Sequence, residues 1–243
     1  MKAHMGRQPR HRGHLNMHQG LAGCAISFDL DGTLVDTAPD LVRATNVVMD
    51  AAGLEAISLS AVRGMVGQGA RALIIKAGLS FGVTFDDATL ARHVELFLES
   101  YQANLTALSR PFDGVEAALV RLAERGALLS VCTNKAASLA HPVLEAFDLH
   151  RFFAAIICNG EAGVNKPDGR HLTHAIEASG GKVDHALMIG DSITDVQAAR
   201  NAGVPVAIVS FGYTNEKAST LGADAVFDHF DELPELAETL VSG

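Results

Sequence analysis

Two aspartates two positions apart, Asp29 and Asp31, are the residues whose type and spacing most directly suggest chemistry. They stand at the end of an apolar run that starts at Cys24, and Gly32 and Thr33 then break the strand pattern. In a parallel sheet, ligands bind in the crevice outside the carboxyl ends of the strands, so both carboxylates would face such a crevice. The alternative is a purely structural turn, because Asp and Gly are common where strands end. The position directly after an apolar strand favours the functional interpretation.

The pair must be positioned by the elements around it, and the sequence predicts a sheet buried on both faces. Runs rich in Val, Ile, Leu and Ala are typical of such strands. The predicted strands are Cys24–Asp29, Ala127–Thr133, Ala154–Cys158, Ala186–Gly190, Val204–Ser210 and Ala225–Phe227. Amphipathic patterns between the later runs predict helices at Gly114–Arg125, Ser138–Phe147, Asp168–Ala178 and Asp195–Ala202. Because strands and helices alternate, the predicted fold is α/β with a doubly wound parallel sheet.

Residues 40–110 interrupt this alternation, since they show helical periodicity without a convincing buried strand. We therefore expect a small all-helical cap domain inserted after the first strand and standing over the sheet. The predicted organisation is a flexible basic extension at 1–20, a core formed by 21–39 and 111–243, and a cap at 40–110.

Composition and charge narrow the class of protein. The net charge of −9 makes non-specific binding to nucleic acid an unfavourable interpretation. No apolar run reaches the roughly 18 residues of a membrane span, and residues 1–20 lack the apolar run of a signal peptide. The three cysteines lie in or beside apolar runs, which predicts buried, reduced thiols in a cytoplasmic protein: Cys24, Cys132 and Cys158.

The segment from Asp29 to Thr33 resembles the first motif of the haloacid dehalogenase-like hydrolase superfamily. Three later segments are similar to its other motifs and occur in the same order. Residues 129–134 match the second motif, 165–167 the third and 189–195 the fourth. The resemblance covers about residues 23–235, which is nearly the whole chain.

This resemblance implies a role for each carboxylate of the motifs. Asp29 would be the nucleophile that forms an aspartyl-phosphate, because carboxylates can accept phosphoryl groups. Asp31 would be the general acid towards the leaving oxygen and later the base for water. Mg²⁺ would be held by Asp29, Asp191 and the backbone carbonyl of Asp31, and would reduce repulsion between nucleophile and phosphate.

The remaining motif residues would bind the phosphate or support those that do. Thr133 and Asn134 are expected to contact the substrate, with the Thr133 hydroxyl holding phosphoryl oxygens. Lys166 would neutralise charge between nucleophile and phosphate, and Asp195 would orient Lys166 or the metal's water molecules. Taken singly, each residue also has a structural explanation: Thr133 and Asp195 could stabilise helix N-termini, and Lys166 could be a solvated loop residue.

The choice of substrate depends on the insertion. Residues 66–71 are similar to the cap segment of phosphoglycolate phosphatases, in which glycines precede a helix facing the active site. Arg71 could grip a carboxylate with two hydrogen bonds, and 2-phosphoglycolate would satisfy this arrangement. The alternative is an exposed helical arginine preceded by glycines that form a turn.

Several function classes are distinguished by these residues. Dehalogenases of the superfamily lack the second Asp of the first motif, so Asp31 argues against that activity. Phosphosugar mutases keep both aspartates, and phosphatases of sugar phosphates, nucleotides or pyrophosphate also remain open. Outside enzymes, a receiver domain would be about half as long and a catalytically dead relative would lack one of the motif residues. We therefore expect a Mg²⁺-dependent phosphatase of a small phosphorylated metabolite, foremost 2-phosphoglycolate, as a monomer or a homodimer.

Overall fold

The computed structural model describes residues 20–242, and its centre is a six-stranded parallel sheet. The predicted extension at 1–20 lies outside this range except for Gly20. The strands follow the order β5-β4-β1-β6-β7-β8. Their bounds are β1 Ala25–Phe28, β4 Leu128–Cys132, β5 Ala155–Ile157, β6 Ala186–Gly190, β7 Val206–Val209 and β8 Ala225–Phe227. All six predicted strands are present, so the predicted α/β fold with a doubly wound parallel sheet is confirmed.

Strand β1 lies between β4 and β6, where the chain changes its direction of travel across the sheet. Ligand crevices in open α/β sheets form at this switch point. The β1 residues are fully buried, and a hydrogen bond of 2.7 Å joins the hydroxyls of Ser27 and Ser130 across the β1–β4 pair. The end of β1 is thus the point of the sheet best placed to carry a site.

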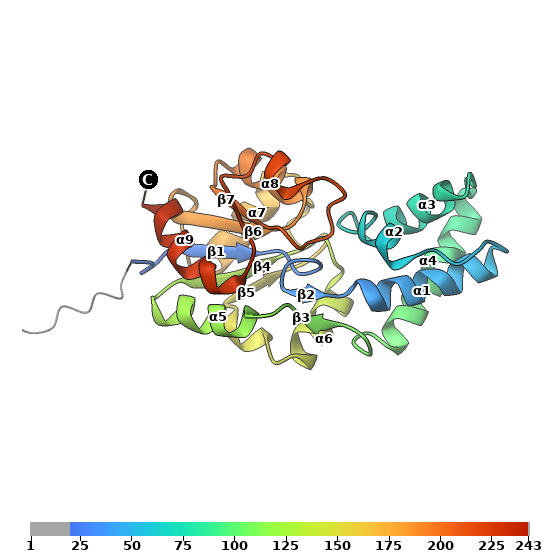
Figure 1. Ribbon diagram of the computed structural model, residues 1–243, viewed down its shortest axis with the longest axis horizontal. Coiled ribbons are helices and arrows are strands. Elements are labelled where there is room, and N and C mark those ends of the chain that lie inside the picture. Colours follow the sequence, from blue (N-terminus) through green and yellow to red (C-terminus); the bar gives the residue numbers. More distant parts are fainter. Residues whose placement is uncertain (1–19, 243) are drawn as a thin grey trace, which may run out of the picture.

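Helices cover both faces of the sheet (Figure 1). One face packs on α7 (Gly169–Ala178) and α8 (Ile193–Ala202) through a buried cluster that includes Leu172 and Val196. The other packs on α5 (Val115–Glu124), α6 (Ala137–Ala146) and α9 (Leu233–Val241). Short 3₁₀ turns occupy His150–Phe152, Val183–His185, Ala218–Thr220 and Phe230–Glu232.

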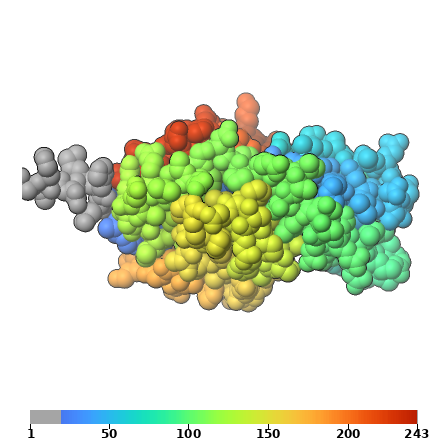
Figure 2. Space-filling model, turned by 90° about the horizontal axis from the view of Figure 1, so that it is seen from below, coloured from blue at the N-terminus to red at the C-terminus, as the bar shows by residue number. Residues whose placement is uncertain are grey.

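Four helices form a separate body beyond the carboxyl ends of the strands (Figure 1), and in Figure 2 this part of the chain gathers at one end of the molecule. They are α1 (Ala38–Ala51), α2 (Leu59–Arg63), α3 (Ala70–Ser80) and α4 (Asp87–Ala103). Their side chains enclose a hydrophobic cluster of their own, in which Met49, Ile74 and Phe97 are buried. We propose that this helical insertion is the cap, and we take its bounds as 38–109 rather than 40–110 because α1 starts at Ala38.

The insertion leaves and re-enters the core through a ribbon that was not predicted. Strand β2 (Val35–Asp36) pairs antiparallel with β3 (Arg110–Pro111). This pairing brings both connections of the insertion side by side, close to the end of β1. A movement of the helices relative to the sheet would therefore bend the chain at this ribbon.

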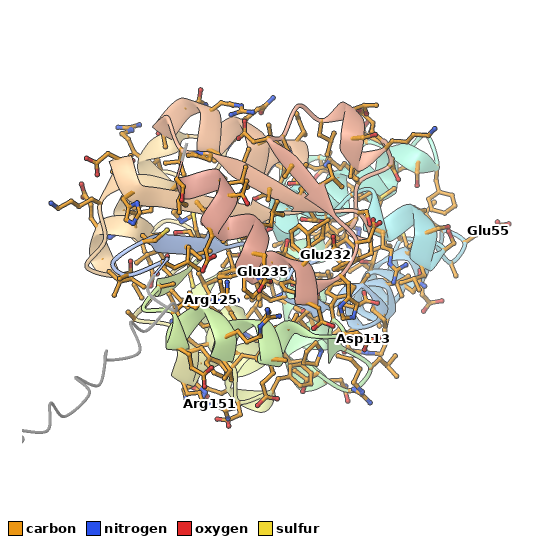
Figure 3. The ribbon with its side chains drawn as sticks, turned by 60° about the vertical axis from the view of Figure 1, so that its left-hand side comes forward. Glu55, Asp113, Arg125, Arg151, Glu232 and Glu235 are labelled. Carbon is orange, nitrogen blue, oxygen red and sulfur yellow. The ribbon has the colours of Figure 1, made fainter. Side chains whose placement is uncertain are left out.

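The last helix, α9, is attached to α5 by ion pairs as well as by apolar contacts. Figure 3 shows Arg125 beside Glu235, and Arg125 also donates to Glu238 at 2.9 Å. Arg121 donates to both carboxylate oxygens of Glu235, at 2.7 and 2.9 Å. Within residues 20–242, no helix combines the length and the apolar character needed to cross a membrane.

Candidate active site

The loop after β1 places Asp29 and Asp31 at the edge of the sheet, where the sequence predicted a crevice. The backbone N–H of Asp29 donates to Ile189 in β6, which fixes the start of the loop. Gly32 has a φ of +85°, and a Cβ there would lie 2.4 Å from Oδ2 of Asp191. A Cβ at Gly212 would lie 2.2 Å from Cβ of Asp191. Glycine is thus required on both sides of the Asp191 carboxylate for the loops to approach it.

Three buried carboxylates, those of Asp29, Asp191 and Asp195, have oxygens within 4.8 Å of one another. Oxygen ligands of this kind suit a hard divalent cation. Oδ2 of Asp195 accepts three hydrogen bonds and its Oδ1 accepts one from Lys166, whereas Asp191 accepts one on each oxygen, from the Thr33 hydroxyl and the Tyr213 N–H. Asp195 is thus the most heavily hydrogen-bonded of the three, so Asp29 and Asp191 are better placed to hold a cation and Asp195 to support them.

Lys166 lies between two of these carboxylates. Its Nζ is 2.7 Å from Oδ1 of Asp195, in hydrogen-bonding geometry, and 2.9 Å from Oδ1 of Asp29. Asp195 is held in turn by the backbone N–H of Asp191 and by the backbone and hydroxyl of Ser192. Asp195 thus holds the ammonium of Lys166 beside Asp29, in the arrangement expected from the motifs.

The electrostatics of the group follow from burial and from these pairs. Burial raises the pKa of Asp29 to about 6, although Lys166 opposes the rise. Burial, followed by the charges of Asp195 and Asp29, raises the pKa of Asp191 well above its usual value. For Lys166, burial alone lowers the pKa, but Asp195 and Asp29 outweigh it and the pKa is raised. The carboxylates therefore carry more negative charge than one lysine offsets, which favours binding of a cation.

Thr133 and Asn134 follow β4 and occupy different positions in the site. Thr133 lines the cavity beside Asp29, and its hydroxyl accepts a hydrogen bond from the backbone N–H of Lys135 at 3.2 Å. The Asn134 amide donates to the carbonyls of Gly67 and Lys166 and accepts from the N–H of Lys166. Asn134 therefore links the insertion to the loop that carries Lys166, and its side chain makes its hydrogen bonds to protein groups.

His171 supports the loop that carries Lys166. Its Nδ1 accepts a hydrogen bond from the backbone N–H of Lys166 at 3.1 Å, and the side chain is fully buried. Burial, followed by the charge of Lys166, lowers the pKa of His171 to about 4. The ring is therefore neutral at physiological pH and can remain an acceptor.

Lys135 is a residue of the site that sequence reasoning missed. Its Nζ lies 2.9 and 3.1 Å from the two carboxylate oxygens of Asp31 and 2.9 Å from the hydroxyl of Tyr101 in α4. Asp31 also accepts a hydrogen bond of 2.6 Å from the Thr37 hydroxyl. The one available signal was a lysine directly after the Thr-Asn pair of the second motif.

A cavity of about 230 Å³ lies between the strand ends and the helical insertion. Asp29, Asp31, Thr133 and Lys135 form its core side. The wall contributed by the insertion is mainly apolar and includes Leu41, Val66, Leu73, Phe97 and Leu98, and Leu139 of α6 lines the cavity from the core. Small-molecule pockets usually measure about 300–1,000 Å³, so this space suits a small substrate.

Arg71 does not reach this cavity. Its neighbour Ala70 and Leu73 line the space, whereas the Arg71 side chain is 60% exposed and pairs with the solvent-exposed Asp87 at 3.1 Å. Successive helical residues are about 100° apart, so Arg71 projects away from the wall that Ala70 forms. The expectation that Arg71 grips the substrate's carboxylate is corrected by this placement.

Comparison with known proteins agrees with the geometry. The profile of the haloacid dehalogenase-like hydrolase family matches residues 26–209, which include all four motifs. This chain belongs to that family. The match confirms the resemblance that the motifs indicated.

Individual relatives of this haloacid dehalogenase-like hydrolase are similar over nearly their whole length. A phosphoglycolate phosphatase of Caulobacter vibrioides is 46% identical over 91% of this chain and 94% of its own. An N-acetylmuramic acid 6-phosphate phosphatase of Pseudomonas aeruginosa is 33% identical over 88% and 94%. The crystal structure of a predicted phosphoglycolate phosphatase from Haemophilus somnus superposes with a TM-score of 0.82 at 28% identity, covering 87% and 96%. The first two relatives are named as phosphatases and the third as a predicted one, and the family places this chain among hydrolases.

Proposed function

We propose that this protein hydrolyses phosphate monoesters with the help of Mg²⁺ and that its substrate is 2-phosphoglycolate, which it converts to glycolate and phosphate. The observation that carries the proposal is the arrangement at the end of β1. There, Asp29 lines the cavity, its Oδ1 lies 2.9 Å from Nζ of Lys166, and its carboxylate groups with that of Asp191. The phosphoglycolate phosphatases among the relatives support the choice of substrate.

The chain's own residues have distinct tasks in this reaction. Asp29 attacks the phosphorus and forms an aspartyl-phosphate, while Asp31 protonates the leaving oxygen of glycolate. Asp31 then takes a proton from the water that releases phosphate from Asp29. The hydroxyl of Thr133 and the ammonium of Lys166 hold the transferred group, and Asp195 holds Lys166.

Asp29 and Asp191 would hold the Mg²⁺, together with the backbone carbonyl of Asp31. When bound, the ion supplies positive charge that reduces repulsion between the phosphate and the attacking carboxylate. The site buries more carboxylates than positively charged side chains, which is consistent with a need for the positive charge of this ion.

The cavity of about 230 Å³ accommodates a two-carbon phosphorylated acid, and an adjoining cavity of about 200 Å³ shares Asp31, Val66 and Gly67 with it. A closed position of the insertion over the site would also exclude water from the leaving group.

A steady-state panel tests the proposal. The purified protein is assayed with Mg²⁺ on 2-phosphoglycolate, N-acetylmuramic acid 6-phosphate, glucose 6-phosphate, a nucleoside monophosphate and pyrophosphate. We expect the highest kcat/KM for 2-phosphoglycolate and loss of activity in excess chelator. A higher kcat/KM for a hexose phosphate would contradict the assigned substrate, and full activity in chelator would contradict the assigned metal.

A further inference from the structure

Lys135 presents a buried ammonium group to the cavity, and the reaction steps above do not use it. The side chain of Lys135 is 4% exposed. Burying a lysine costs both hydration and side-chain freedom, so an interaction must offset that cost. Asp31 and the Tyr101 hydroxyl offset part of it, and the ammonium also lies 4.7 Å from the centre of the Tyr101 ring.

Lys135 is the one positively charged side chain among the described residues that line the cavity. Lys166 pairs with Asp29 and Asp195 and is assigned to the phosphoryl group, and Arg71 projects into solvent. The rest of the wall contributed by the insertion is mainly apolar. A negative group of the substrate other than its phosphate would therefore find its attraction at Lys135.

Tyr101 adds a hydrogen-bond donor at the same place. Its oxygen accepts from Lys135 at 2.9 Å, and the described part of the chain offers its hydroxyl proton no acceptor. A phenol can donate one hydrogen bond while it accepts another. Tyr101 is fully buried in α4, so this unused donor lies inside the protein, on the cavity wall opposite the sheet.

The position of Lys135 relative to Asp31 determines where the second negative group of the substrate would lie. Asp31 is proposed to protonate the leaving oxygen, and the ammonium of Lys135 lies within 3.1 Å of both Asp31 oxygens. In a phosphorylated 2-hydroxy acid the carboxylate is only one carbon away from the leaving oxygen. A carboxylate at that spacing falls beside Lys135 and Tyr101.

We propose that Lys135 and Tyr101 together bind the substrate's carboxylate, Lys135 from the core and Tyr101 from the insertion. This inference rests on the proposed function and replaces Arg71 as the acid-recognising residue. It defines the substrate class as short acids phosphorylated on the hydroxyl of the carbon next to the carboxylate. It also makes recognition depend on the insertion being closed, because the two groups come from different parts of the fold.

A matched pair of inhibitors tests this inference without turnover. 3-Phosphonopropionate carries a carboxylate that propylphosphonate replaces with a methyl group, and neither has a phosphoester bond to hydrolyse. Their inhibition constants are measured in Mg²⁺ buffer with p-nitrophenyl phosphate as the reporter substrate. We expect wild type to bind the carboxylated inhibitor at least about tenfold more tightly, since a charged hydrogen bond commonly contributes that much.

Variants assign that preference to residues. Lys135→Met should reduce the tenfold preference to less than about twofold, and Tyr101→Phe should reduce it by roughly threefold. Lys217→Met is the control, because Lys217 is exposed and lines neither this cavity nor the adjoining one. Its preference should stay within about twofold of wild type. Because the readout is a ratio, a general loss of affinity or of Asp31 function does not alter it.

Two results would overturn the inference: equal binding of both inhibitors by wild type, or an unchanged preference in Lys135→Met. Where Lys135→Met does not fold, as judged by circular dichroism, an unchanged preference in Tyr101→Phe is the deciding result. The substrate panel distinguishes this failure from failure of the proposed function. Hydrolysis of 2-phosphoglycolate with no role for Lys135 would leave the function intact, whereas a Lys135-dependent preference with another acid as best substrate would leave the inference intact.

Discussion

Replacement of Lys166 by methionine should destabilise the protein strongly, because Lys166 is the cation shared by Asp29 and Asp195. The lysine is 4% exposed, and its Nζ lies 2.9 Å and 2.7 Å from these carboxylates. Removing one partner of a buried ion pair costs about 3–5 kcal/mol. A chain of this size loses about 2–4 °C in Tm per kcal/mol, so the expected decrease is on the order of 10 °C at pH 8 in chelator.

The size of this loss should depend on pH in a definite direction. The pKa of Asp29 in the folded state is raised to about 6, whereas the unfolded value is about 3.9. The folded state therefore binds this proton more tightly, and the burial of Asp29 costs stability above pH 6 but progressively less as pH falls towards 4. Lys166 is the main group that lowers this pKa, so its removal raises the pKa further. The gap between wild type and variant should be largest near pH 8 and clearly smaller at pH 5.

Urea unfolding followed by circular dichroism, at both pH values and in chelator, measures the effect. Lys217→Met is the control, because Lys217 is exposed and makes no described ion pair. It should change the free energy of unfolding by less than about 0.5 kcal/mol. A loss below about 1 kcal/mol for Lys166→Met at pH 8, or an equal loss at both pH values, would refute the reasoning.

Three further predictions concern other parts of the site. Asp31→Asn should lower kcat/KM for 2-phosphoglycolate by roughly 10²–10⁴-fold, but much less for p-nitrophenyl phosphate, whose leaving group needs no proton; similar losses would contradict a general acid. Wild type should lose stability as the pH falls from 6.5 to 4, because the pKa of His171 is about 4 in the folded state and the unfolded chain therefore binds the proton more tightly. His171→Asn should make this loss of stability smaller. Urea melts across that range should show about 2–3 kcal/mol less dependence on pH than wild type, and an unchanged slope would argue against a buried neutral histidine. Mg²⁺ at a hundred times its Kd should raise the Tm of wild type by about 5 °C or more, and a rise of the same size in Asp191→Asn would exclude that carboxylate as a ligand.

The sheet could be predicted because its strands are buried on both faces and therefore appear as continuous apolar runs. Strands β1, β4 and β6 fall within the predicted runs, and the motif residues stand at their ends. The β2–β3 ribbon could not be predicted in this way, because each strand is two residues long and shows no periodicity. Its partners are also separated by the whole insertion.

Lys135 and Arg71 show the limit of sequence reasoning most clearly. Lys135 looks like a solvated lysine until Asp31, 104 positions away, and Tyr101, 34 positions away, are placed beside it. Arg71 looked suitable because glycines precede it, but the orientation of α3 relative to the sheet decides which side chains face the cavity. That orientation depends on packing of the insertion against Leu139 of α6, a contact for which the local sequence has no signal.

The most direct test of the central claim is detection of a phosphoryl group on Asp29 during turnover. The protein is mixed with 2-phosphoglycolate and Mg²⁺, quenched in acid within the first turnovers, digested and analysed by mass spectrometry. We predict a peptide that contains Asp29 and carries one added phosphoryl group, absent without Mg²⁺ and absent in Asp29→Asn, which should also lack hydrolysis. Hydrolysis at the wild-type rate by Asp29→Asn, or a phosphoryl group on another residue, would contradict the account.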